Sequence, residues 1–125
     1  MENRESSIRE IEDLQVYRKA YGLSIDIHHA SLALPKHEQY ELASQMRRAS
    51  KSICALLAEG FGKQSISKAE FKRYILMAMG SADEMRLWLQ YCFDLGYIDK
   101  LKVSQWREEY KTVAKMLTGL HHKWG

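Results

Sequence analysis

Apolar residues recur along this chain at alternating steps of three and four positions, which is the spacing of one face of an α-helix. The first such series runs from Val16 to Leu34, and the last runs from Val103 to Trp124. The pattern predicts helices over residues 14–34, 38–59, 68–95 and 100–123. Residues 1–10 lack it and are expected to form a flexible N-terminal segment, which leaves residues 11–125 for a four-helix bundle.

The residues that break helices coincide with the predicted helix ends. Pro35 ends the first helix, because the residue before a proline avoids the α region. Gly60 and Gly62 are expected to end the second helix, where glycine can adopt a left-handed stop, and Gly96 ends the third. Residues 67–70 read Ser-Lys-Ala-Glu, which is a capping box at the start of the third helix.

Composition favours long helices over a sheet. The chain has 125 residues with one proline and seven glycines, too few breakers for a many-turned β-sandwich or barrel. Because the predicted helices are long and the loops short, we expect an all-α, up-down-up-down antiparallel four-helix bundle. Charged residues interrupt every apolar segment before it could span a membrane, and nothing marks the chain for secretion, so a cytoplasmic location is expected.

The third helix has a second apolar stripe beside its core face. This stripe contains Tyr74, Met77, Trp88 and Tyr91, about 100° around the helix from the first. An exposed aromatic patch of this kind is typical of a partner surface, so these residues are candidates for a subunit interface. The alternative is a splayed bundle in which the stripe covers a wide core.

Positive charge is concentrated in the middle of the chain. Residues 35–73 hold 8 basic and 4 acidic side chains, whereas the whole chain has a net charge of only +3. A basic cluster there could contact phosphates of RNA or DNA, largely without sequence preference. The alternative is a solvated polar face whose basic groups pair with Glu41, Glu59 and Glu70. The candidate nucleic-acid-binding residues are Arg47, Arg48, Lys51, Lys63, Lys68, Lys72 and Arg73.

No motif in the sequence predicts an enzyme. Asp26 and His29 form a D-x-x-H pair, but a di-iron bundle needs two E-x-x-H motifs and two further carboxylates. Residues 65–68 match S-x-x-K without the partner motifs of that enzyme class. Cys54 and Cys92 are too few for a disulfide or zinc framework. We therefore expect no catalytic residues, no metal site and no cofactor.

Segments along nearly the whole chain resemble one protein family. This family comprises small bacterial four-helix-bundle proteins related to those encoded by intervening sequences in 23S rRNA genes. The sequence departs from the family pattern at Ile11 and Tyr17, where Phe and Trp are usual, and at Cys54 and Leu56, where Pro and Asn are usual. The matching segments are residues 11–20, 35–36, 44–49, 52–53, 58–62, 67–71, 80–84, 95–98 and 116–120.

The resemblance implies a homo-oligomer, specifically a homopentameric ring. It also implies a relation to the accessory variability determinant of diversity-generating retroelements, a basic pentamer that binds nucleic acid and a reverse transcriptase. Two function classes follow as hypotheses. The first is a nucleic-acid-binding accessory protein that acts through the basic cluster, with RNA, DNA, a reverse transcriptase or another protein as partner. The second is a protein-interaction or scaffold bundle with no nucleic-acid role.

Overall fold

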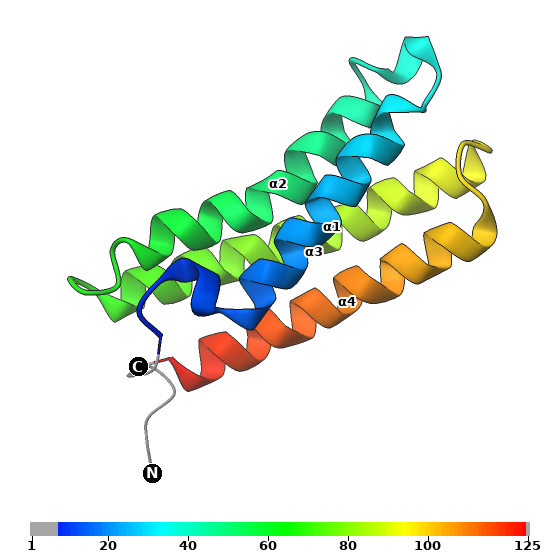
Figure 1. Cartoon of the computed structure of the whole chain (residues 1–125). Helices are drawn as coiled ribbons and strands as arrows, with labels where there is room; N and C mark the ends of the chain where they lie inside the picture. Colours follow the sequence, from blue (N-terminus) through cyan, green and yellow to red (C-terminus); the bar gives the residue numbers. More distant parts are fainter. Residues whose placement is uncertain (1–7, 125) are drawn as a thin grey trace.

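The computed structural model describes residues 8–124, and in that range it contains helices and no strand. The α-helices are α1 (Gln15–Leu32), α2 (Leu42–Phe61), α3 (Lys68–Asp94) and α4 (Lys100–Lys123), with 3-10 turns η2 (Ile11–Asp13) and η3 (Lys36–Glu38). Successive helices run antiparallel (Figure 1), which confirms the predicted all-α four-helix architecture. Residues 1–7 of the segment expected to be flexible lie outside the described residues, and Ile8 packs against the core.

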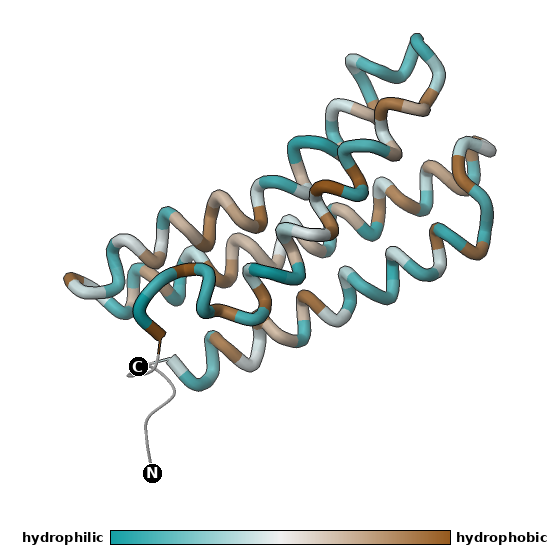
Figure 2. The backbone as a smooth tube through the Cα atoms, viewed as in Figure 1, coloured by the Kyte–Doolittle hydropathy of each residue, from teal (hydrophilic) through white to brown (hydrophobic). Residues whose placement is uncertain are grey.

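One apolar face of each helix is buried in a shared core. Ile27, Ile53, Ile75 and Leu117, one from each helix, are completely buried. Hydrophobic residues alternate with hydrophilic ones along each helix (Figure 2). Because each large aliphatic side chain contributes roughly 1.5–3 kcal/mol when buried, this core is the main source of stability.

The ends of α3 and α4 are set by specific local contacts. Ser67 Oγ accepts a hydrogen bond from the Glu70 backbone N–H at 3.2 Å, so the predicted cap of α3 is present. The Glu70 carboxylate, which a full capping box would direct to the backbone, instead pairs with Arg73 at 2.7 Å. Gly96 follows α3 with φ of 80°, a left-handed conformation that suits glycine. Asp99 caps α4 through the Lys102 N–H at 2.8 Å.

Gly60 has a different role from the predicted helix stop. It lies inside α2 and is buried, and Gly62 after it has an ordinary helical φ of −62°. A Cβ at Gly60 would lie 2.5 Å from the Cβ of Tyr74. The absence of a side chain therefore lets α2 and α3 approach closely here, and the expected left-handed stop does not occur.

The α1–α2 connection is longer than the pattern predicts. The second helix is expected from residue 38 but begins at Leu42, since Lys36–Glu38 form the separate turn η3. In Figure 1 this connection rises above the α3–α4 loop. The two loops still touch, because the Tyr97 hydroxyl donates to Glu38 at 2.7 Å.

Candidate nucleic-acid and partner surfaces

Arg47, a candidate phosphate contact, is turned inward. Its guanidinium donates to Ser31 Oγ at 2.9 Å, to Gln39 Oε1 at 3.2 Å and to the Gln39 carbonyl at 2.7 Å. The Gln39 amide in turn donates to the carbonyls of Ser31 and Leu34. The helical spacing places Arg47 with Arg48 and Lys51, but the structure corrects this grouping, because Arg47 holds the α1–α2 loop.

Arg48 and Lys51 remain on the exposed side of α2. Arg48 forms an ion pair with Glu84 of α3 and also donates to Gln45. Lys51 Nζ lies 2.8 Å from His28 Nδ1 on α1. The positive charge of Lys51 holds the pKa of His28 below its usual value. Both basic groups stay accessible to a phosphate, although each already has a partner within the chain.

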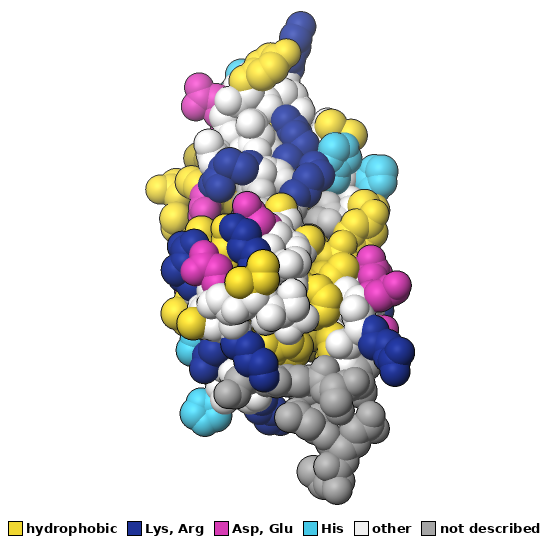
Figure 3. Space-filling model, turned by 90° about the vertical axis from the view of Figure 1, so that its left-hand side faces the viewer, with side chains coloured by type: hydrophobic (Ala, Val, Ile, Leu, Met, Phe, Trp, Pro, Cys, Tyr) yellow, Lys and Arg dark blue, Asp and Glu magenta, His cyan; other side chains and the backbone are white. Residues whose placement is uncertain are grey.

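The remaining basic candidates gather where α2 turns into α3. Lys63 Nζ donates to the Tyr74 hydroxyl at 3.2 Å, and both Lys63 and Arg73 lie 5.0 Å from the centre of the Tyr74 ring. Lys68 is exposed and Lys72 is partly exposed on the first turns of α3. Viewed from the left-hand side of Figure 1, the molecule shows basic side chains interspersed with acidic ones (Figure 3). The basic cluster at the α2–α3 turn therefore contains acidic side chains as well, with more positive than negative charges.

Part of the second stripe on α3 is covered by α2. Tyr74, a candidate interface residue, is only 7% exposed and packs against Gly60. Ser81 accepts a hydrogen bond from Ser52 at 2.6 Å, and Glu84 pairs with Arg48. The prediction of an exposed aromatic stripe is therefore wrong at Tyr74, where the alternative of a wide core holds.

The rest of that stripe does reach the surface. Met77 and Tyr91 are exposed, and Trp88 is partly exposed. Leu76 and Leu87, which belong to neither predicted stripe, are also about half exposed. We call Leu76, Met77, Leu87 and Tyr91 the outer α3 face. Leu87 and Tyr91 are four residues apart and therefore neighbours on the helix surface, so this spacing in the sequence could have predicted the outer α3 face.

Trp88 and Tyr91 also line a groove between the start of α2 and the end of α3. The groove has a volume of about 350 Å³. The centres of the Trp88 and Tyr91 rings lie 6.0 Å apart, and the ring planes are inclined by 36°. We call it the α2–α3 groove; its lining residues are Glu38, Tyr40, Glu41, Leu42, Gln45, Trp88, Tyr91 and Leu95.

Cys54 and Cys92 are buried free thiols on α2 and α3. Within residues 8–124, no group of three or more His, Cys, Asp or Glu side chains could hold a metal ion. Burial raises the pKa of the Cys54 thiol to about 11 and that of Cys92 to about 12. Among the described helices, none combines the length and apolarity needed to cross a lipid bilayer.

These features define a class of protein: an antiparallel four-helix bundle with basic and apolar surfaces on α2 and α3. The family model of the 23S rRNA-intervening sequence protein matches residues 12–119. The chain therefore belongs to the 23S rRNA-intervening sequence protein family, as the sequence resemblance indicates. No curated protein sequence matches the chain significantly.

A solved structure has the same fold. It is the crystal structure of a protein with unknown function from the S23 ribosomal protein family of Bacteroides thetaiotaomicron, at 1.70 Å resolution. The two chains share 21% sequence identity and superpose with a TM-score of 0.76, over 86% of this chain and 95% of the other. This similarity supports the bundle architecture and carries no information about a ligand.

Proposed function

We propose that this protein is a non-enzymatic, oligomeric bundle that binds RNA or DNA through phosphate contacts of the α2–α3 basic surface. The observation that supports this proposal is the charge surplus in residues 35–73, which contain 8 basic and 4 acidic side chains. This α2–α3 basic surface consists of the proposed contacts Arg48, Lys51, Lys63, Lys68, Lys72 and Arg73. Arg47 is left out because its guanidinium is hydrogen-bonded to Ser31 and Gln39.

The ion pairs within this surface do not prevent phosphate binding. Arg48 and Arg73 keep about half of their side-chain area exposed in their pairs with Glu84 and Glu70. Exposed pairs of this kind contribute only about 0–1 kcal/mol, so a phosphate can replace the carboxylate at small cost. An oligomer would present the surface several times, and this multivalency would compensate for the modest charge of each chain.

The test is the salt dependence of binding to a fluorescent single-stranded RNA and a DNA duplex. The variant Arg48→Ala with Lys51→Ala should weaken binding and reduce the slope of log K against log salt by about 1–2. A matched control, Lys111→Ala with Lys115→Ala, removes the same charge from the exposed side of α4. Binding that is absent at about 50 mM salt, or that falls equally in both variants, contradicts the proposal.

The outer α3 face favours a second candidate function, a protein-interaction or scaffold bundle. Leu76, Leu87 and Tyr91 each leave about half of their area in solvent, which is typical of a partner surface. If copies of the chain cover this face, Leu87→Glu should lower the sedimentation mass. Leu101→Glu on α4, at a more exposed leucine, should leave it unchanged. A monomeric parent protein excludes self-association through this face.

A further inference from the structure

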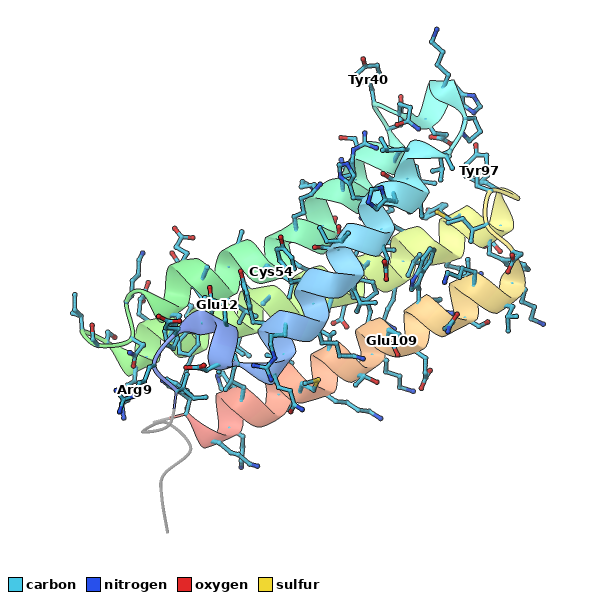
Figure 4. The ribbon with its side chains drawn as sticks, in the orientation of Figure 1. Arg9, Glu12, Tyr40, Cys54, Tyr97 and Glu109 are labelled. Carbon is cyan, nitrogen blue, oxygen red and sulfur yellow. The ribbon has the colours of Figure 1, made fainter. Side chains whose placement is uncertain are left out.

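The α2–α3 groove lies outside the basic surface and has a different chemical character. Leu42 and Leu95 supply apolar lining, and Trp88, Tyr91 and Tyr40 supply aromatic lining. Tyr40 is 95% exposed and projects from the loop that precedes α2 (Figure 4). A tyrosine so exposed makes almost no contribution to the core, so its ring is available to an occupant.

The two rings on α3 form one continuous aromatic wall. Their centres are 6.0 Å apart, and this spacing leaves no room for a ligand between them. The indole N–H of Trp88 already donates to Glu84 at 3.1 Å. A ligand in the groove would therefore contact the ring surfaces of Trp88 and Tyr91. Aromatic ring faces attract cations.

The rim of the groove is acidic. Glu38 accepts hydrogen bonds from the Tyr97 hydroxyl at 2.7 Å and from the Leu42 N–H at 3.4 Å. Within residues 8–124, neither Glu38 nor Glu41 forms an ion pair with a basic side chain. Arg48 borders the groove through Gln45, but its charge is paired with Glu84. Two carboxylates that pair with no basic side chain of the described residues therefore lie beside the aromatic rings of Trp88 and Tyr91.

From this combination we infer that the α2–α3 groove binds an arginine side chain of a partner polypeptide. A guanidinium is flat and weakly hydrated, so it stacks on aromatic faces and also forms paired hydrogen bonds with a carboxylate. A quaternary ammonium is held best by an enclosing aromatic cage, whereas this groove is open to solvent. The two carboxylates repel nucleic-acid phosphates, so this site is separate from the proposed nucleic-acid surface.

The inference can be tested on the whole protein with a small arginine probe. Of the three tryptophans, Trp106 and Trp124 are buried and Trp88 is partly exposed. Titration with N-acetyl-arginine amide should shift the indole N–H NMR signal of Trp88, which the variant Trp88→Phe assigns, and leave the other two in place. N-acetyl-citrulline amide, which has nearly the same shape but no charge, should produce no saturable shift.

Two exposed positions provide variants that do not endanger folding. Glu41→Gln and Tyr40→Ala should each weaken binding of the arginine probe by about threefold or more, since each removes one exposed charge or ring contact. Glu108→Gln, the same chemical change at an exposed position of α4, should leave the affinity unchanged. If all three variants keep the thermal stability of the parent protein, the weaker binding of the arginine probe results from the change in the groove and not from unfolding.

Three results would overturn the inference. The first is equal binding of the citrulline and arginine probes, and the second is an unchanged affinity in Glu41→Gln. The third is loss of oligomer mass in Tyr40→Ala at equal protein concentration, because the groove would then hold a second copy of this chain. A short RNA that shifts the Trp88 signal as the arginine probe does would also contradict a site for a basic polypeptide.

Discussion

Replacing Gly60 by alanine sets two physical effects against each other. Alanine is the better helix former, and in the interior of a helix the change from glycine is favourable by about 0.5–1 kcal/mol. Against this, the new Cβ would lie 2.5 Å from Tyr74 Cβ, 2.9 Å from Tyr74 Cγ and 3.1 Å from Phe71 Cδ1. Carbon atoms in contact normally lie about 3.5–4.0 Å apart, so the two helices would have to separate locally by about 1 Å.

The steric effect is expected to dominate. Phe71 is completely buried and Tyr74 is nearly so, and the clash with Tyr74 Cβ cannot be relieved by a rotamer change. Overpacking of this kind costs about 1–3 kcal/mol, and a contact this short belongs at the upper end of that range. Gly60→Ala should therefore lose about 2 kcal/mol of stability, which for a domain of this size lowers the Tm by roughly 6–10 °C.

The matched control is Gly22→Ala. Gly22 lies within α1, and a Cβ there would meet nothing within 4 Å. This variant should gain about 0.5–1 kcal/mol from helix propensity alone. Urea unfolding followed by circular dichroism, at one protein concentration because self-association stabilises the folded state, measures both changes. If Gly60→Ala is as stable as the parent or more stable, the explanation of Gly60 by close helix approach is refuted.

Three further predictions concern polar and titratable groups. Arg47→Met should destabilise the fold by about 2 kcal/mol, since it removes three partly buried charge-assisted hydrogen bonds, whereas Arg48→Ala should cost about 1 kcal/mol or less in the same urea assay. The His28 pKa, measured by NMR, should lie below 6.5 and rise in Lys51→Met. Because the unfolded chain binds the proton more readily, this group makes stability fall as the pH drops through 6.5 toward the folded-state value, and it has no such effect above pH 6.5. With raised pKa values of about 11 and about 12, Cys54 and Cys92 should react with a thiol reagent at pH 8 only after the protein is denatured, and rapid labelling of the native protein would contradict their burial.

Most of the fold could be predicted because each helix carries its own periodic signal. The third and fourth helices match closely: 68–95 and 100–123 were predicted, and α3 and α4 span Lys68–Asp94 and Lys100–Lys123. The start of α2 could not be predicted as well. The turn η3 has helix-like spacing over a few residues, and a short 3-10 turn cannot be distinguished from a first α-helical turn by periodicity.

The candidate surfaces were predicted less well, because spacing along one helix does not reveal what the neighbouring helix covers. Arg47 and Arg48 are adjacent in sequence and share a charge, yet Arg47 binds the α1–α2 loop while Arg48 remains exposed. Likewise, Tyr74 and Tyr91 belong to one predicted stripe, but α2 covers Tyr74 at the close approach to Gly60.

The sequence by itself determined the helices, their order and the family, since these depend on local periodicity and on motifs that can be read along one chain. Only the tertiary structure decided which polar and aromatic side chains are exposed to solvent and which are held by contacts with other helices. In the folded chain Tyr74 is buried, and Arg47 is hydrogen-bonded to the α1–α2 loop. Tyr40 and Glu41 lie with Trp88 along the α2–α3 groove. The physical reason is that exposure and charge pairing are properties of helix packing, which joins residues far apart in sequence.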